Sequence, residues 1–516
     1  MTTPNVIIIH TDQQRYDSLG CTGSEYAQTP NLDRLAAEGS VFHRHFCAAP
    51  SCMPSRAALF TGLHPLANGT WTNGVPLPRK EYEPHYVRPN STLHVCIEPM
   101  TIADYFALRG YTTRSLGKLH LTPTLSPSEC GYPESHEFMT AAGFADWHGP
   151  YYGFQHVEFS KGHGVLPMRV GHYHHWLAER APELFEREFG PDADPQRNSP
   201  APGLCAPLDM PEELHHTSWI AEREIALIDE DRADGRPFFH FLGIADPHHP
   251  VAVPNEVLAR FDGDVPPPSF PETDWVDGHP NGDRFQRAGE RPPEALREFI
   301  RYTAAANALI DDAVGRIVSH LEERGLLENT IIVFTSDHGD FLGDHGLLMK
   351  SHSACTALLH TPLIIRGPGP GPGAGAGTPE AGADAAALPA STMATVSNMD
   401  VFPTLAHLSG GTVPEGLHGR DLVASTQSGE PGRAYAFSSA GPPYTLNQTV
   451  CDGRFRYTVY PHAGRVELYD HIEDRGDTRN LASDPGHRTD VERLGTELAA
   501  ASLRHTVPIL RRVSEW

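Results

Sequence analysis

The stretch Val6-Ile7-Ile8-Ile9-His10-Thr11-Asp12-Gln13 decides the fold class. Its first four residues form a continuous β-branched apolar run, which is typical of a central parallel strand buried on both faces. The run changes abruptly to polar residues at His10, and Asp12 and Gln13 follow. Open α/β sheets place their functional side chains beyond the carboxyl ends of the strands. The stretch therefore predicts a core strand that delivers a carboxylate to a site.

Similar apolar runs recur along the chain, and several of them end in polar residues. Helices with one apolar face and a glycine stop are expected at 29–39 and 102–110, and a longer amphipathic helix at 302–321. Strands that alternate with helices predict an α/β fold with a large, mostly parallel sheet flanked by helices. The further expected strands cover residues 41–42, 111–116, 238–244, 330–335 and 362–366.

The pattern changes after about residue 425. Residues 454–460 alternate in polarity, residues 465–470 form a second expected strand, and a helix is expected from about Val491. These elements predict a small C-terminal αβ subdomain over residues 426–516, after a catalytic domain over residues 1–425. Within the first domain, the Gly-, Pro- and Ala-rich residues 367–391 are predicted to form a low-complexity surface loop.

The charge balance narrows the range of partners. The 516 residues include 40 Lys and Arg against 65 Asp and Glu, a formal charge of −25. Nucleic acids and anionic membranes bind basic surfaces, so neither is an expected partner. No export signal and no window of about 18 apolar residues is present. The eight cysteines are dispersed without a CxxC pair, and a cytoplasmic location is expected.

Three parts of the chain carry residues suited to a reaction centre. Cys52-Met53-Pro54-Ser55-Arg56 opens a rare string that continues through small and apolar residues to Thr61-Gly62. Asp337-His338 follows the expected strand 330–335, as Asp12 follows the first strand. A strand-end aspartate taken alone usually caps a helix or closes a turn. Together, carboxylates on distant segments predict a site for a hard divalent cation.

Basic side chains follow other expected strands. Lys118 and His120 are separated by one residue, and in extended backbone such side chains point the same way. This spacing predicts a cation beside a proton carrier. His248 follows a strand and a proline turn, and Lys350 lies in the loop after Asp337. Taken one at a time, these residues also suit a solvated surface.

In their order along the chain, these motifs resemble the sulfatase family, and the string from Cys52 to Gly62 resembles its signature. The resemblance implies an alkaline-phosphatase-like fold, one divalent cation and hydrolysis of an aryl or carbohydrate sulfate ester. It implies formylglycine at Cys52, made by a formylglycine-generating enzyme. Phosphonate and phosphate mono- or diester hydrolases share the signature and form the alternative. The resembling segments are 6–13, 29–39, 52–62, 117–121, 247–250, 336–350 and 468–481.

The resemblance also implies the metal ligands, which are Asp12, Gln13, Cys52 in its modified form, Asp337 and His338. Family members often carry aspartate at the position of Gln13 and asparagine at that of His338. These departures reduce the negative charge around the cation and introduce an imidazole. Calcium is the expected ion and manganese the alternative, because imidazole suits transition metals.

The remaining roles also follow from the resemblance. Arg56 is expected to hold the hydrated aldehyde, and Lys118 and Lys350 to clamp the sulfuryl oxygens. His248 or Lys350 would protonate the leaving oxygen. His120 would then deprotonate the second hydroxyl of the nucleophile, so that sulfate leaves. The motifs point in two directions, because the pair of Gln13 and His338 resembles the phosphonate-hydrolase branch, whereas the segment 117–120 resembles the sulfatase branch.

Two further hypotheses concern Cys52. One is a protein that only binds anions, with Cys52 as an ordinary buried thiol. The other is a hydrolase with a thiolate nucleophile, which the sequence disfavours because no nearby motif supplies an oriented histidine. The alcohol half of the substrate and homo-oligomer formation stay open.

Overall fold

The computed structural model describes most of the chain. The described residues are 3–79, 98–160, 169–190, 193–194, 198–270, 276, 278–369, 388–429, 432–441 and 445–506.

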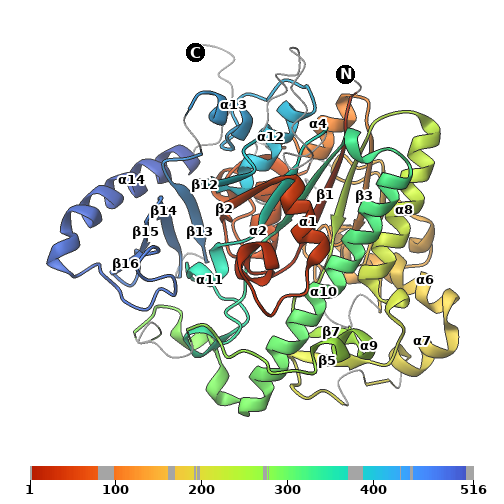
Figure 1. The fold of residues 1–516 in the computed structure, drawn as a ribbon, viewed down its shortest axis with the longest axis horizontal. Coiled ribbons are helices and arrows are strands. Elements are labelled where there is room, and N and C mark those ends of the chain that lie inside the picture. Colours follow the sequence, from red (N-terminus) through yellow and green to blue (C-terminus); the bar gives the residue numbers. More distant parts are fainter. Residues whose placement is uncertain are drawn as a thin grey trace.

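A mixed eight-stranded sheet forms the centre of the molecule (Figure 1). Its strand order is β12-β2-β11-β9-β1-β6-β3-β4. β11 runs antiparallel to both of its neighbours, and the other pairings in the described sheet are parallel. The strands are β1 (Asn5–Thr11), β2 (Ser40–Phe46), β3 (Thr112–Gly117), β4 (His156–Glu158), β6 (Phe238–Gly243), β9 (Thr330–Ser336), β11 (Leu363–Arg366) and β12 (Ser391–Ser397).

Strand β1 occupies the middle of this sheet, and its side chains alternate between two apolar layers. Ile7 and Ile9 pack with α1 (Pro30–Glu38), α8 (His216–Asp234) and α10 (Pro293–Glu323). Val6 and Ile8 pack on the opposite face with α2 (Cys52–Thr61), α4 (Ile102–Leu108) and α12 (Val401–Leu408). Each fully buried side chain of this kind contributes about 1.5–3 kcal/mol. Burial on both faces explains why the run is uninterrupted, and the predicted α/β fold is confirmed.

The expected helices at 29–39 and 102–110 are present as α1 and α4. The helix expected at 302–321 is longer, because α10 begins at Pro293. Ala295 and Phe299 continue its buried face toward the N-terminus, and a proline is favourable in the first helical turn. The remaining elements are α3 (Pro65–Asn68), α5 (His136–Met139), α6 (His172–Arg180), α7 (Pro182–Phe189), α9 (Asn255–Leu258), α11 (Thr356–Leu359), α13 (Leu422–Gln427), β5 (Cys205–Leu208), β7 (Val251–Pro254), β8 (Gln286–Arg287) and β10 (Leu347–Leu348).

A second, antiparallel sheet lies at the left of the molecule in Figure 1. It contains β13 (Ala436–Ala440), β14 (Asn447–Cys451), β15 (Phe455–Tyr460) and β16 (Arg465–Asp470), and α14 (Arg488–Thr506) packs against it. The predicted C-terminal αβ elements are therefore present. The boundary at residue 425 stays a prediction, and it falls within α13. Of the predicted loop at 367–391, residues 370–387 lie outside the described residues, and residue 391 begins β12.

In the described part of the chain, no helix has the length and apolar character needed to cross a membrane. The seven cysteines of that part are free thiols, in agreement with their dispersed spacing.

Candidate active site

The candidate site lies where the carboxyl ends of neighbouring parallel strands meet the first turn of α2. Asp12 follows β1, Lys118 follows β3 and Asp337 follows β9. The sheet order delivers these three side chains to one edge. Cys52 is the first residue of α2, which ends at Thr61 and is capped by Gly62 with a φ of 63°. The side chains at this edge are buried, so each charge needs a partner inside the protein.

Four of the predicted ligands form one compact group. The ligand atoms of Asp12, Cys52, Asp337 and His338 all lie within 4.8 Å of one another. The sulfur of Cys52 is 3.3 Å from Nε2 of His338 and 3.6 Å from Oδ1 of Asp12. These residues come from three segments, and 326 positions separate Asp12 from His338. The fold brings them together.

Hydrogen bonds orient the ligand atoms. Nδ1 of His338 lies 2.9 Å from the carbonyl oxygen of Gly339, so it carries the proton and leaves the lone pair of Nε2 facing Cys52. Oδ1 of Asp337 accepts from the backbone N–H of Gln13 at 3.0 Å and from that of His338 at 2.9 Å. Metal-bound histidines and carboxylates are commonly held by such outer hydrogen bonds.

The backbone of Gln13 contacts this group through Asp337, and its side chain carries a neutral oxygen. Its backbone has a φ of 68°, and its amide nitrogen hydrogen-bonds Asp340 and lies 2.8 Å from Nδ1 of His249. Its Oε1 is buried and has no hydrogen-bond partner among the described residues. A buried acceptor in that position is costly unless a cation or water satisfies it. Two carboxylates, an imidazole and this amide oxygen therefore fit a divalent cation.

Two buried cations balance the carboxylates. Arg56 donates to Oδ2 of Asp337 at 2.9 Å, to Oδ2 of Asp12 at 3.1 Å and to the carbonyl oxygen of Lys118 at 2.8 Å. Nζ of Lys118 lies 2.6 Å from Oδ2 of Asp12. Burial by itself would raise the pKa of Asp12, but Lys118, His248 and Lys350 hold it well below its ordinary value. Asp12 is therefore an anion at neutral pH.

Lys350 lies over the thiol. Its Nζ is 2.8 Å from the sulfur of Cys52, 2.9 Å from Nε2 of His338 and 3.0 Å from Nε2 of His248. Burial and Asp12 would raise the pKa of Cys52, whereas Lys350 and Lys118 bring it below its ordinary value. The site thus stabilises negative charge on the atom attached to Cβ of residue 52.

His248 is part of this cluster, and its Nδ1 bonds the carbonyl oxygen of His249. His120 lies at the end of the loop after β3, but the extended backbone expected between Lys118 and His120 is wrong. His120 has a φ of 57°, and its backbone N–H donates to the carboxylate of Glu134. Glycine at 117, with a φ of 82°, already turns the chain out of the strand.

Several supporting residues escaped the sequence interpretation. Oγ of Ser55 donates to the carbonyl oxygen of Asp337, and Asn398 donates to both oxygens of Ser55 at 3.0 Å. Oδ1 of Asn73 accepts from the N–H of Met53 at 3.0 Å, in the first turn of α2. Each contact joins distant segments, so no local pattern signals it.

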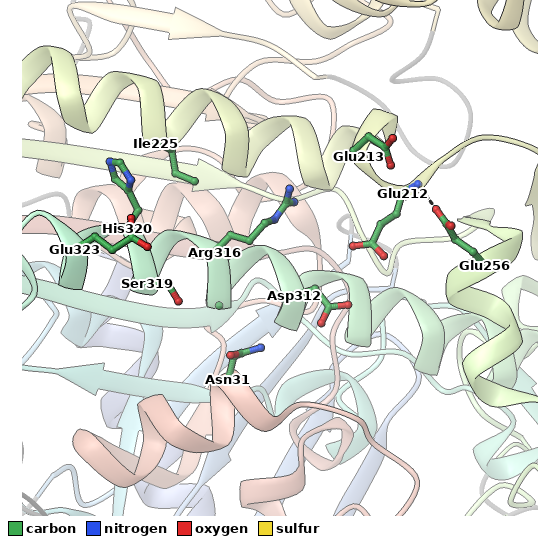
Figure 2. Close-up of a pocket in the computed structure, with 11 residues that line it drawn as sticks. Asn31, Glu212, Glu213, Ile225, Glu256, Asp312, Arg316, Ser319, His320 and Glu323 are labelled. Carbon is green, nitrogen blue, oxygen red and sulfur yellow. Dashed lines mark hydrogen bonds between the residues drawn. The ribbon is translucent and has the colours of Figure 1, made fainter.

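Other polar groups in the described residues have separate explanations. A cavity of about 760 Å³ lies against α8 and α10. Figure 2 shows the residues that line it, and Cys52 is not among them.

His215, His216 and Asp246 form a second group of polar side chains. Both ring nitrogens of His215 already bond backbone groups, and Thr217 donates to Asp246 at 2.6 Å. That group supports the turn before His248.

Comparisons with known proteins agree with this architecture. The family model described as Sulfatase matches residues 4–411. An arylsulfatase of Clostridium perfringens is 26% identical over 503 residues, covering 95% of this chain and 92% of that protein. The multifunctional alkaline phosphatase superfamily protein PehA of Trinickia caryophylli is 27% identical over 528 residues, covering 94% and 93%. The phosphonate monoester hydrolase structure from Agrobacterium radiobacter has a TM-score of 0.74 at 23% identity, covering 97% and 96%.

The mixed eight-stranded sheet with a small C-terminal antiparallel sheet is an alkaline-phosphatase-like fold. Because the family model spans most of the sequence, the chain belongs to the sulfatase family. It is a sulfuric ester hydrolase.

Proposed function

We propose that this chain hydrolyses an aryl or carbohydrate sulfate ester through formylglycine formed from Cys52, with one divalent cation. The observation that carries the proposal is the position of Cys52. Its side chain lies beside Asp12 and His338 and within 2.8 Å of Nζ of Lys350. The modification requires a formylglycine-generating enzyme as a partner.

In this proposal the cation would be held by Asp12, Asp337, His338 and the side-chain oxygen of Gln13. Such an ion lowers the pKa of a hydroxyl bound to it and polarises the ester oxygens. Hydrated formylglycine supplies two hydroxyls on one carbon, one to attack sulfur and one to permit release of sulfate. Arg56 is already fixed by both carboxylates, and it can hold the hydrate without reorganising.

The two lysines and two histidines have distinct roles in this proposal. Lys118 and Lys350 stabilise negative charge on the sulfuryl oxygens from two sides of the site. His248 shares a hydrogen bond of 3.0 Å with Lys350, so the pair can deliver a proton to the leaving oxygen. His120 takes the proton of the second hydroxyl. A serine or cysteine lacks that hydroxyl, which is the physical advantage of the modification.

The ligand set suits calcium or manganese. Calcium is the expected ion because carboxylate and amide oxygens predominate. Manganese is the alternative because His338 supplies a nitrogen. Metal analysis of the purified protein, followed by reconstitution with each ion, distinguishes them.

A phosphonate or phosphate ester hydrolase is the second candidate function. The pair of Gln13 and His338 favours it, because this pair resembles the phosphonate-hydrolase branch. Comparison of kcat/KM for para-nitrophenyl sulfate and para-nitrophenyl phenylphosphonate tests the choice. Higher kcat/KM for the sulfate supports sulfatase activity, and the reverse order supports the alternative.

A thiolate mechanism has one supporting contact that no local sequence motif reveals. His338 supplies an oriented imidazole 3.3 Å from the sulfur of Cys52, although 286 positions separate the two. Peptide mass spectrometry at residue 52 distinguishes the chemistry. Activity that rises with the aldehyde fraction supports formylglycine, whereas full activity of the unmodified thiol supports a thiolate. Retention of anion binding without any turnover would indicate an anion-binding protein.

A further inference from the structure

A buried carboxylate outside the reaction centre organises the loop that follows β3. Glu134 is fully buried, and three successive backbone N–H groups of that loop donate to it. The N–H groups of Leu121 and Thr122 lie 2.8 and 3.1 Å from its Oε1, and that of His120 bonds its Oε2. Tyr151 also donates its hydroxyl to Oε1 at 3.1 Å. Successive N–H groups that converge on an anion form a concave binding site, called a nest.

The nest explains the unusual backbone of His120. A φ of 57° is sparsely populated for residues other than glycine, because the side chain then crowds the backbone. This conformation helps the N–H groups of residues 120–122 converge on the carboxylate. Hydrogen bonds to a charged acceptor are about twice as strong as neutral ones. The carboxylate of Glu134 can therefore hold a conformation that the chain would otherwise leave.

The same loop carries two residues of the proposed mechanism. Lys118 is fixed at its carbonyl oxygen by Arg56, at 2.8 Å, and at its amine by Asp12, at 2.6 Å. His120 lies beyond these contacts, and its backbone is fixed by Glu134. The loop is thus held at one end by Arg56 and at the other by the buried carboxylate.

We infer that Glu134 is the positioning residue for His120: its carboxylate binds the N–H groups of residues 120–122 and sets where the imidazole lies. This inference rests on the proposed function, in which His120 removes a proton after the ester bond has broken. In this inference Glu134 acts as a positioning residue and not as a catalytic one. Its effect on the reaction is exerted through the loop backbone.

The test compares Glu134→Gln with wild type at known aldehyde content, with para-nitrophenyl sulfate as the probe. The amide keeps the size of the side chain but replaces one acceptor oxygen with a donor that faces an N–H group. We expect kcat to fall about 10- to 100-fold, because a small misplacement of a reacting group has effects of that size. The value of kcat/KM should fall much less, because His120 acts after the first irreversible step.

Asp311→Asn is the matched control. Asp311 is an equally buried carboxylate that accepts from the N–H groups of Leu32 and Asn31, at 2.7 and 3.1 Å, at the start of α1. Its replacement should lower the unfolding midpoint and leave KM unchanged, so that any change in kcat is matched by an equal change in kcat/KM. Similar kinetic behaviour of the two variants would overturn the inference.

Amide hydrogen exchange gives a second readout that does not depend on turnover. Peptides that contain residues 120–122 should exchange faster in Glu134→Gln than in wild type and Asp311→Asn, because the bonds to the carboxylate are weakened. Unchanged exchange would overturn the inference. If Glu134→Gln does not fold, Glu134→Asp, which retains the charge but reaches less far, replaces it in both measurements. Failure of fully modified wild type to cleave the sulfate would reject the proposed function and leave the exchange result standing.

Discussion

Nζ of Lys350 lies 2.8 Å from the sulfur of Cys52, although 298 positions separate the two residues. The contact connects the first turn of α2 with the loop that follows β9. It places a cation over the position where the proposed nucleophile develops negative charge. The same amine bonds His338 and His248, so one side chain links the ligand group to the proposed proton donor.

Replacement of Lys350 by methionine should reduce kcat/KM for para-nitrophenyl sulfate by about 10²- to 10³-fold, the range found for other groups that stabilise developing charge. The unmodified form of the variant should also have a higher Cys52 pKa, because Lys350 lowers it in the wild type. Thiol alkylation as a function of pH measures that change. An unaltered alkylation profile would show that Lys350 does not lower the pKa of Cys52.

Cys52→Ser should retain the fold and lose turnover, because a plain hydroxyl has no second oxygen from which sulfate can be expelled. Circular dichroism and a thermal unfolding curve establish that the variant is folded. Turnover equal to that of the wild type would contradict the proposed chemistry. Cys47→Ser is a suitable control, because Cys47 is also buried but is absent from the ligand group.

Removal of the cation should lower the unfolding midpoint, because a ligand that binds only the folded state stabilises it in proportion to RT ln(1 + [L]/Kd). Calcium or manganese should restore the midpoint of the wild type. In Asp337→Asn this response should disappear. The variant also weakens the buried pair with Arg56, and removal of one partner of such a pair costs about 3–5 kcal/mol. A full metal response in the variant would exclude Asp337 as a ligand.

The environment of His240 should make the free energy of unfolding depend on pH. It is buried on β6 between Glu224 and Asp231 of α8, at 2.9 and 2.8 Å, and Arg114 of β3 also pairs with Asp231. Burial lowers the pKa of His240, but the two carboxylates raise it to about 9. Relative to an unfolded value near 6.5, this difference corresponds to about 3 kcal/mol. The stabilisation is complete below pH 6.5 and is lost as the pH rises through 9.

Denaturant unfolding at several pH values between 6 and 10 tests this contribution. The free energy of unfolding of the wild type should decline across the interval by more than that of His240→Gln. Parallel curves for the two proteins would mean that the imidazole does not gain charge on folding.

Asp477 links the C-terminal sheet to α11, and its replacement should lower the free energy of unfolding. Asp477 accepts from the backbone N–H and hydroxyl of Thr356, at 2.7 and 3.0 Å, and lies 2.9 Å from the guanidinium of Arg456. Asp477→Asn leaves Arg456 buried beside weaker partners, so we expect a loss of about 3–5 kcal/mol. Calorimetry should show it. Asp484→Asn, at an exposed pair with Arg479, should change the midpoint little.

The core of the fold was accessible from sequence because its signals are local. The apolar run of β1 and its change to polar residues at Asp12 reflect burial on two faces and exposure at one end. Asp337-His338 after β9 carries the same signal. Family resemblance then placed these residues in one site, which spacing alone does not do.

The supporting contacts were not accessible because they depend on tertiary structure. His338 reaches Cys52 across 286 positions, and Asn398 reaches Ser55 across 343. The error at His120 has a local cause. A positive φ cannot be read from a histidine, and it is held there by Glu134, which follows 14 positions later.

The position of Cys52 early in the chain has a consequence for its maturation. The amine of Lys350 and the imidazole of His338 are synthesised long after the thiol, and in the finished molecule they enclose it. An enzyme that modifies residue 52 before the chain has folded can therefore reach the side chain. In the folded protein the side chain of Cys52 is buried and is not accessible to such an enzyme. If formylglycine forms at Cys52 as proposed, the order of the segments along the polypeptide limits the interval in which it can be made.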